Sequence, residues 1–183
     1  ELDLENDPTP TKLINRTTLE IFKKELTVWD YGGQTAYRQQ YFTHSQLYFS
    51  EISILYYVLD IQEPTLLQKN LDYFSEIANH VMKLSPRAKF VLFFHKYDPH
   101  HEGDYDNNGL QSSILQSIPK IFDQKELSVI VYRTSIYDPS SIIAAFLQPI
   151  IYHTDIYELV TGMLKKFIEK HNLSFALLMT QRK

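Results

Sequence analysis

The sequence predicts an α/β protein in which a parallel sheet carries helices on both faces. Three observations lead to this fold class. Nearly continuous apolar runs are typical of strands buried on both faces, each run is followed by a segment with helical apolar spacing, and 183 residues suffice for one such domain with a small appendage. Strands that alternate with helices form parallel sheets, because each helix carries the chain back to the start of the next strand.

The strands and helices of this domain follow a simple order along the chain. An antiparallel hairpin comes first, because two β-branched and aromatic runs flank three charged residues. Three strands then alternate with three helices. In chain order the expected elements are hairpin strands 17–22 and 26–30, strand 52–60, helix 66–84, strand 90–94, helix 110–122, strand 127–132 and helix 140–151.

A second unit is expected to begin near the end of the chain. Residues 154–171 have the apolar spacing of an amphipathic helix, and residues 173–179 are strand-like. We therefore assign residues 1–152 to the main domain and residues 153–183 to the start of another unit.

Composition excludes several classes of function. Acidic residues outnumber basic residues by 22 to 18, so nothing indicates nucleic acid as a partner. The chain has no cysteine, which excludes disulfides, thiolate zinc sites and cysteine nucleophiles and is compatible with the cytoplasm. No apolar run reaches the roughly 18 residues of a membrane helix. Any membrane contact is expected to be indirect, through partners.

The second hairpin strand runs into a segment suited to a metal and a phosphate. Asp30 can hold Mg²⁺ through water, and the backbone N–H of Gly33 can approach a phosphate because no Cβ stands in the way. Gln34 can orient an attacking water. Upstream, the hydroxyl of Thr11 is a possible second Mg²⁺ ligand. Taken alone, these residues fit a plain glycine turn at least as well.

Polar residues also follow two of the buried strands. Asp98 can accept both N–H groups on one edge of guanine, and the stem of Lys96 can lie over the base plane. After the last strand, backbone N–H groups of Thr134, Ser135 and Ile136 can contact a base carbonyl oxygen. In a parallel sheet, ligands bind beyond the carboxyl ends of the strands, which is where both segments lie.

Together these four segments resemble the motifs of Ras-like GTPases in order and spacing. Thr11 corresponds to the switch I threonine, 30–34 to the switch II Asp-x-Gly-Gly-Gln, 95–98 to the guanine motif and 134–136 to the base-contacting motif. The spacing from Thr11 to Trp-Asp is also that of Arf-like proteins.

Three details are similar to the Rag family within that superfamily. They are His95 in place of the usual asparagine, Arg-Thr-Ser-Ile at 133–136, and Gln-Tyr-Phe-Thr at 40–43. The resemblance extends over residues 8–183. It implies a three-layer P-loop-NTPase-like fold, followed at 153–183 by the opening of a roadblock-type dimerisation domain.

The resemblance also implies a function. GTP or GDP would bind with Mg²⁺, with Thr11 and Asp30 at the metal and Gln34 placing the water for hydrolysis. Gly33 would contact phosphate, and the base would be held by His95, Lys96, Asp98 and 134–136. The implied partner is a second GTPase-like subunit or a roadblock protein. That family works in nutrient signalling and is recruited by partners to endolysosomal membranes.

One motif of the family is missing from the sequence. None of the five glycines fits the P-loop pattern Gly-x-x-x-x-Gly-Lys-Ser/Thr. The strand before the P-loop lies mid-sheet in the family, here between strands 26–30 and 52–60, and an unfilled gap would leave two rows of backbone groups unpaired. Three explanations stay open: about 40 further residues upstream, a strand supplied by a partner, or residues 173–179 filling the gap. We favour the first, because the chain starts abruptly at Glu1. The alternative function is a non-hydrolysing pseudo-GTPase that serves as a binding or dimerisation module.

The segment 99–109 is interpreted as a solvated insertion. Asp104, Asp106, Asn108 and Gly109 match the start of a calcium-binding EF-hand loop, but Leu115 stands where the bidentate glutamate is required.

Overall fold

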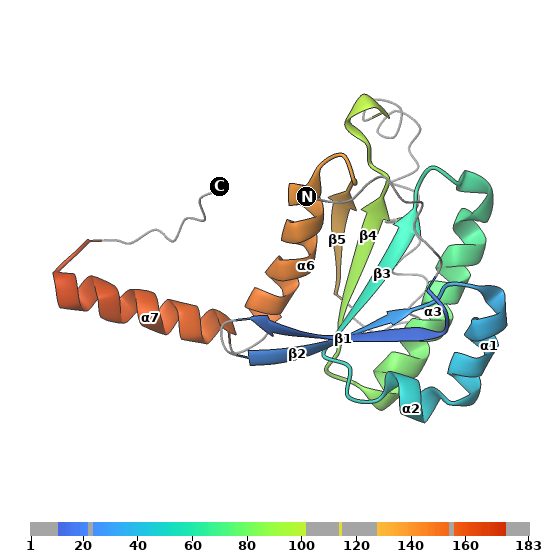
Figure 1. Cartoon of the computed structure of the whole chain (residues 1–183), viewed down its shortest axis with the longest axis horizontal. Coiled ribbons are helices and arrows are strands. Elements are labelled where there is room, and N and C mark those ends of the chain that lie inside the picture. The colour runs from blue at the N-terminus through green and yellow to red at the C-terminus, as the bar shows by residue number, and fades with distance from the viewer. Residues whose placement is uncertain (1–10, 22–23, 102–113, 115–127, 154–155, 175–183) are drawn as a thin grey trace. The chain divides into compact units, whose positions relative to one another are not determined.

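The structure is a computed structural model that describes residues 11–21, 24–101, 114, 128–153 and 156–174. The chain divides into two units, residues 1–50 and 51–183, and each is described by itself. Figure 1 shows the elements and their labels.

The first unit consists of a β-hairpin followed by two helices (Figure 1). Strand β1 (Ile14–Ile21) pairs antiparallel with β2 (Lys24–Tyr31), from Ile14 opposite Tyr31 to Ile21 opposite Lys24. The predicted hairpin is thus confirmed, with longer strands. Helices α1 (Thr35–Thr43) and α2 (Ser45–Phe49) follow. The buried ring of Tyr41 packs edge-on against Tyr31, with ring centroids 5.2 Å apart, which ties α1 to the hairpin.

Three parallel strands form the sheet of the second unit. Strands β3 (Ile54–Asp60), β4 (Lys89–His95) and β5 (Val129–Thr134) lie in the order β3-β4-β5. This confirms the three predicted strands and the parallel sheet. The last strand ends two residues later than predicted, because Arg133 and Thr134 continue the pairing with β4.

Helices cover both faces of this sheet, as predicted. A short 3₁₀ turn, η1 (Pro64–Leu66), leads into α3 (Leu67–Leu84), and α6 (Pro139–His153) follows β5 (Figure 1). The neighbouring residues Tyr56 and Tyr57 point to opposite faces of β3. The Tyr56 hydroxyl donates to the Phe146 carbonyl of α6 over 2.8 Å, and the Tyr57 hydroxyl donates to the Asn70 carbonyl of α3 over 2.8 Å.

The core lies on both sides of β4. All five residues from Phe90 to Phe94 are buried, as expected of a central strand covered on both faces. On one face Val91 and Phe93 pack with Ala145 of α6. On the other, α3 presents the apolar stripe that its sequence predicts, with these five residues buried: Leu71, Phe74, Ile77, Ala78 and Val81.

Removing either tyrosine hydroxyl of β3 is expected to destabilise the second unit by a similar amount. Tyr56→Phe and Tyr57→Phe each delete one hydrogen bond to a helix main chain, which lowers the free energy of unfolding by about 0.5–1.5 kcal/mol. The double variant should lose the sum of the two free energies, because the two hydroxyls act on opposite faces of the sheet. Urea unfolding followed by circular dichroism measures all three values. A double variant much less stable than the sum would show that α3 and α6 are coupled through β3.

The hairpin and the parallel sheet are two separate sheets. Among the described strands, β3 pairs only with β4, so its other edge has no strand beside it. The apolar side chain of Val58 on β3 is 57% exposed. The family resemblance described above predicts that the P-loop-bearing strand would lie next to this edge.

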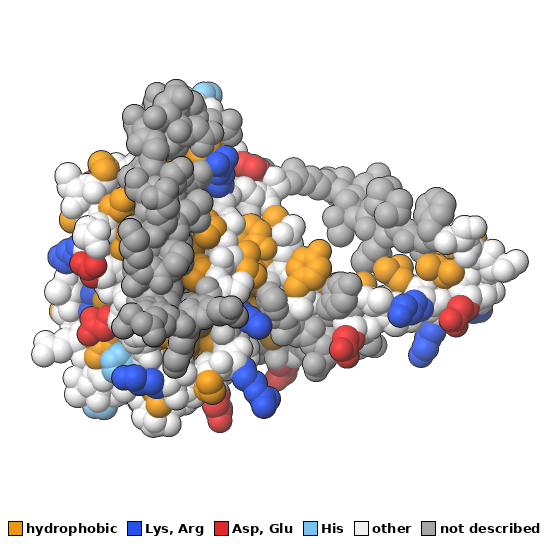
Figure 2. Space-filling model, turned by 180° about the vertical axis from the view of Figure 1, so that it is seen from behind, with side chains coloured by type: hydrophobic (Ala, Val, Ile, Leu, Met, Phe, Trp, Pro, Cys, Tyr) orange, Lys and Arg blue, Asp and Glu red, His pale blue; other side chains and the backbone are white. Residues whose placement is uncertain are grey.

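The separate domain predicted to begin at residues 153–183 is described only at its start. Helix α7 (Ile156–His171) confirms the amphipathic helix expected at 154–171. In Figure 2, hydrophobic side chains lie along one side of this helix and charged side chains along the other. The strand expected at 173–179 and the insertion expected at 99–109 lie mostly outside the described residues, apart from a 3₁₀ turn η2 (Pro99–His101). Of the helix expected at 110–122, only Ile114 is described; it is helical and buried. Within the described part of the chain, no helix is both long and apolar enough to cross a membrane.

Candidate functional site

Polar side chains follow the carboxyl ends of all three parallel strands. The register pairs Asp60 of β3 with His95 of β4, and His95 with Thr134 of β5. The three strands therefore end level with one another, and the residues that follow them meet at one rim of the sheet. The guanine and base-contacting motifs expected from the sequence both lie at this rim.

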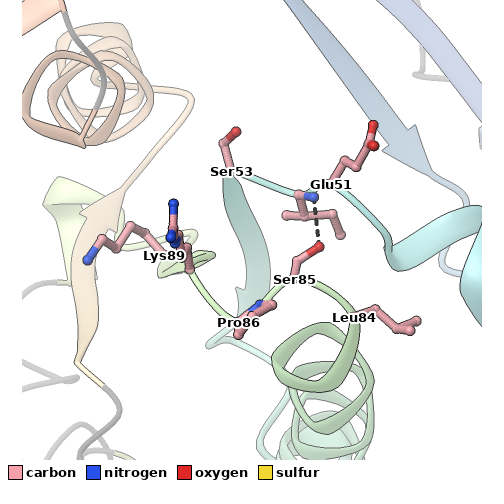
Figure 3. A pocket seen from close by; sticks show the side chains of 8 residues that line it. Glu51, Ser53, Leu84, Ser85, Pro86 and Lys89 are labelled. Carbon is pink, nitrogen blue, oxygen red and sulfur yellow. Dashed lines mark hydrogen bonds between the residues drawn. The ribbon is translucent and has the colours of Figure 1, made fainter.

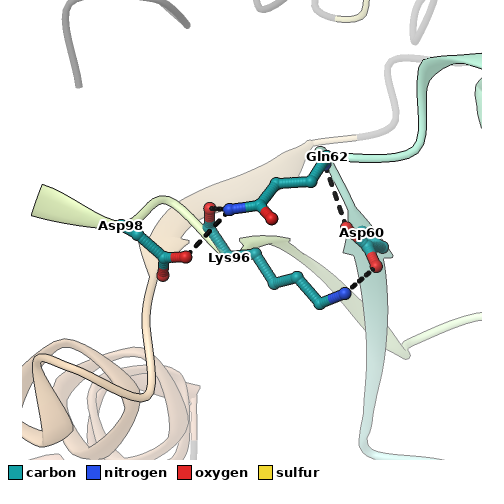
Figure 4. A network of polar contacts seen from close by, with 4 residues as sticks. All are labelled: Asp60, Gln62, Lys96 and Asp98. Atoms are coloured by element: carbon teal, nitrogen blue, oxygen red, sulfur yellow. Dashed lines mark hydrogen bonds and ion pairs between the residues drawn. The ribbon is translucent and has the colours of Figure 1, made fainter. Parts of the chain in front are cut away.

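The carboxylate of Asp98 lies at the centre of the polar cluster. The Ser135 hydroxyl donates to its Oδ1 over 2.6 Å, and the Gln62 side-chain amide donates to its Oδ2 over 2.8 Å. Figure 4 shows the second of these contacts. One donor comes from the β5 side and the other from the β3 side, so both carboxylate oxygens are held in place.

The side chain of Lys96 lies over the end of β3. Its Nζ forms an ion pair with Asp60 Oδ2 at 2.6 Å (Figure 4). The hydrogen bond to Asp60 raises the pKa of the lysine ammonium, which stays charged. The backbone of Lys96 has φ of 62°, a left-handed conformation that is unusual for lysine. This conformation turns the chain after β4, and beyond the turn Asp98 lies within hydrogen-bond distance of Gln62 and Ser135.

Two contacts anchor the guanine-motif loop to β5. His95 Nδ1 and Thr134 Oγ1 are hydrogen-bonded at 3.0 Å, and the Tyr97 backbone N–H donates to the Thr134 carbonyl over 3.0 Å. The buried ring of Tyr97 carries the Arg133 guanidinium 4.6 Å from its centroid. The buried Tyr97 ring thus packs beneath Arg133 and anchors the loop.

The pH dependence of stability should carry a contribution from His95. Burial lowers the pKa of this histidine. The nearby charges of Asp60 and Asp98 act in the opposite direction, and the charge of Lys96 lowers the pKa further. The unfolded chain then binds a proton that the folded chain excludes. The stability that depends on neutral His95 is fully present at pH values above the histidine's ordinary pKa of about 6.5. It is lost as the pH falls from there through the lower pKa of the folded state.

We therefore expect the free energy of unfolding to fall between pH 7.5 and 5.5. In His95→Asn, which cannot titrate in this range, the fall should be smaller. Urea unfolding across this pH range measures the difference between the two proteins. A difference that does not change with pH would contradict a depressed histidine pKa.

The base-contacting motif is more deeply buried than the sequence suggests. Thr134 is the last residue of β5, and both Thr134 and Ser135 are 1% exposed. The Ser135 backbone N–H donates to the Ser141 hydroxyl over 3.1 Å, so this donor is already engaged. Ile136 lies in the turn before α6 with 45% of its surface exposed. The motif is therefore a buried support at Thr134 and Ser135 with an exposed turn after it.

The other candidate residues lie in the first unit and form a cluster of their own. The Thr11 hydroxyl donates to Asp30 Oδ2 over 2.7 Å, so the two candidate metal ligands lie side by side. A hydroxyl and a carboxylate oxygen are ligands that Mg²⁺ accepts. Gly33 is exposed, and a Cβ at this position would meet no atom within 4 Å. Its carbonyl accepts from Arg38 Nε over 2.8 Å. Gln34 is exposed directly before α1.

Sequence reasoning missed Asp60 and Gln62. Asp60 is a polar residue at the end of an apolar strand, as His95 is, and that position was the available signal, because parallel strands end at the same rim. Gln62 carried no signal of its own, since its importance depends on contacts with residues 34 and 36 positions away.

A shallow hollow at the other end of the sheet is separate from this cluster. It is lined by residues around the start of β3 and β4, including Ser53, Ser85 and Lys89 (Figure 3). The Ile52 backbone N–H donates to the Ser85 hydroxyl over 2.9 Å there. Ligands of parallel sheets bind at the carboxyl ends of the strands, so this hollow is not a candidate for the site.

The parallel sheet flanked by helices fits the fold of a P-loop GTPase domain, and comparison with known proteins gives the same class. The family model described as the Gtr1/RagA G protein conserved region matches residues 9–183, and the chain belongs to this family. This confirms the Rag-like resemblance inferred from the motifs.

Individual relatives match a shorter stretch. The chain is 33% identical over 82 residues to Ras-related GTP-binding protein B of Rattus norvegicus and to the protein of the same name in Mus musculus. These matches cover 44% of the chain and 22% of each relative. GTP-binding protein GTR1 of Saccharomyces cerevisiae is 32% identical over 74 residues, or 40% of the chain and 24% of that relative. Each match thus spans less than a quarter of the relative.

Proposed function

We propose that this chain forms the guanine-reading and switch parts of a Rag-type G protein that binds GTP or GDP with Mg²⁺ and hydrolyses GTP. The observation that carries the proposal is the Asp98 carboxylate, fixed by hydrogen bonds at the carboxyl rim of a parallel sheet. Membership of the Gtr1/RagA family and the printed names of the relatives support it.

The chemistry of guanine fits this carboxylate. Guanine presents two N–H groups side by side on one edge, and a carboxylate can accept both in a charge-assisted pair. Adenine has no such pair of donors, so the contact selects guanine. The aliphatic stem of Lys96 supplies an apolar surface for the base plane, while its ammonium stays on Asp60. His95 would support the base-binding loop through its hydrogen bond to Thr134.

The residues of the first unit fit a Mg²⁺ ion and the γ-phosphate. Thr11 and Asp30 are the candidate metal ligands, and when bound the ion would neutralise phosphate charge during transfer to water. The backbone N–H of Gly33 would donate to a phosphate oxygen, and the absence of a side chain at this position supports the assignment. Gln34 would orient the water. Loss of these contacts after hydrolysis would release the segments around Thr11 and 30–34 and change the protein's affinity for its partners.

The phosphates also need a P-loop. The strand edge of β3 that lacks a neighbour among the described strands is where the P-loop-bearing strand would pair. A further segment of the same protein is the first candidate for this strand. A strand from a partner and residues 173–179 are the other two candidates.

Residues 153–183 are proposed to begin the unit through which the protein pairs with a second GTPase-like subunit or a roadblock protein. Met163 and Phe167 of α7 are four positions apart and 63% and 51% exposed, which places an apolar face on the surface of this helix. Such a partner would also recruit the protein from the cytoplasm to endolysosomal membranes.

A nucleotide competition experiment tests the proposal. The full-length protein that contains this chain is titrated with fluorescent mant-GTP in Mg²⁺, and unlabelled GTP, GDP and ATP compete. We expect GTP and GDP to displace the probe at least about 100-fold better than ATP, because adenine cannot satisfy Asp98. Equal competition by ATP would disprove guanine recognition.

The hydrolytic role of Gln34 separates the switch from the pseudo-GTPase alternative. Gln34→Leu should keep GTP affinity and lower the single-turnover rate about tenfold or more, because water is no longer oriented. Gln39→Leu, the same change at another exposed glutamine, in α1, is the matched control. No hydrolysis by the wild type, with binding retained, would favour the non-hydrolysing module.

A further inference from the structure

We propose that Asp60 and Gln62, at the end of β3, are positioning residues for the guanine-motif loop (residues 95–98): Asp60 holds Lys96, and Gln62 holds Asp98. This inference rests on the proposed guanine-nucleotide binding and adds two residues to it. Neither belongs to the four motifs found in the sequence.

Gln62 connects the end of β3 to the loop after β4 through its side-chain amide. Its backbone N–H donates to Asp60 Oδ1 over 2.9 Å. Its side-chain amide donates to the Lys96 carbonyl over 3.1 Å and to Asp98 Oδ2 over 2.8 Å (Figure 4). One amide group therefore contacts both functional residues of the loop at once.

The contact with Asp98 completes the orientation of its carboxylate. The Ser135 hydroxyl holds Oδ1 from the β5 side. With this bond alone the carboxylate can still rotate about the Cβ–Cγ bond. The Gln62 amide holds Oδ2 from the β3 side, so the two donors together fix the plane of the carboxylate. Each oxygen has a second lone pair, so the carboxylate can still accept the two N–H groups of guanine. Gln62 therefore supports the base contact and does not compete with it.

The contacts of Lys96 explain how its unusual backbone is maintained. A non-glycine residue in the left-handed region costs free energy and needs support from its surroundings. The ion pair with Asp60 holds the side chain at 2.6 Å, and the Gln62 amide holds the carbonyl. Both supports come from residues at or just after the end of β3, which lies beside β4 in the sheet.

This arrangement makes a distinct prediction about base specificity. Inosine has the ring N–H of guanine but lacks the exocyclic amino group, so it can satisfy the carboxylate through one donor only. If Gln62 fixes the carboxylate plane, its loss should weaken the two-donor ligand more than the one-donor ligand. General loosening of the loop would weaken both ligands equally.

The test compares GTP and ITP affinities of the full-length protein. Gln62→Met keeps the length of the side chain and removes its donor. We expect GTP affinity to fall about tenfold and the preference for GTP over ITP to fall about threefold or more. The matched control is Gln68→Met on α3, where the amide donates over 2.8 Å to Asp72 Oδ1 on the surface. This control should change neither value by more than about twofold.

A second variant tests the other half of the proposal. Asp60→Asn removes the negative partner of Lys96 and should lower GTP and ITP affinities together by about threefold to tenfold, leaving their ratio unchanged. Circular dichroism shows that each variant is folded.

Four outcomes would overturn the inference. They are wild-type affinities in Gln62→Met, equal losses for GTP and ITP in that variant, a gain in GTP affinity, or wild-type affinities in Asp60→Asn. If the wild type itself binds neither GTP nor ITP, the proposed function fails, and the inference fails with it.

Discussion

Replacing Asp98 by asparagine is expected to convert guanine selectivity into xanthine selectivity. The new amide presents an N–H group where guanine also presents N–H groups, so two charge-assisted hydrogen bonds are lost and two donors face each other. Xanthine has a carbonyl in place of the amino group, and the amide N–H can donate to it. We expect GTP affinity to fall about 10²–10⁴-fold and XTP to become the better ligand.

Competition between mant-GTP, GTP and XTP in the full-length protein measures this exchange. Asp72→Asn is the matched control, because this aspartate on α3 accepts a hydrogen bond from Gln68 outside the site. The control should retain GTP preference. Unchanged GTP affinity in Asp98→Asn would show that the Asp98 carboxylate does not read the base.

The main elements of the fold were predictable because they depend on local patterns. The apolar run from Phe90 to Phe94 indicates a strand covered on both faces, and the structure buries all five residues. The apolar spacing of 66–84 likewise indicates the buried side of α3. Boundaries were less exact, since Arg133 and Thr134 extend β5 through pairing with β4, which is a non-local contact.

The candidate site was predictable where motif residues follow strands, and not where contacts cross between strands. Sequence placed Asp98 and Ser135 after neighbouring strands, and the structure joins them by a hydrogen bond of 2.6 Å. The roles of these residues stay predictions. The contacts of Gln62 depend on which strand lies beside β4 and on the sharp turn at Lys96. Neither feature follows from residue spacing, so no pattern in the sequence indicated Gln62.

The two adjacent glycines after β2 are expected to respond very differently to the same substitution. A Cβ on Gly32 would lie 2.4 Å from the Thr11 carbonyl oxygen and 3.1 Å from the Tyr37 ring. The Gly32 backbone N–H also donates to the Leu13 carbonyl over 2.7 Å, which keeps the two segments close together. An alanine side chain must therefore push the 11–13 segment away. Gly33 has nothing within 4 Å of the same position.

We expect Gly32→Ala to lower the free energy of unfolding of the first unit by about 1–3 kcal/mol, as overpacking does, and Gly33→Ala to change it by less than about 1 kcal/mol. Amide hydrogen exchange along β1 and β2, without nucleotide, measures this stability directly. Because the Thr11 hydroxyl reaches Asp30 over only 2.7 Å, displacement of Thr11 should also weaken Mg²⁺-dependent GTP binding in Gly32→Ala. If the two variants showed equal exchange rates, the close approach of Thr11 to Gly32 would not exist in solution, and the proposed metal site would lose its support.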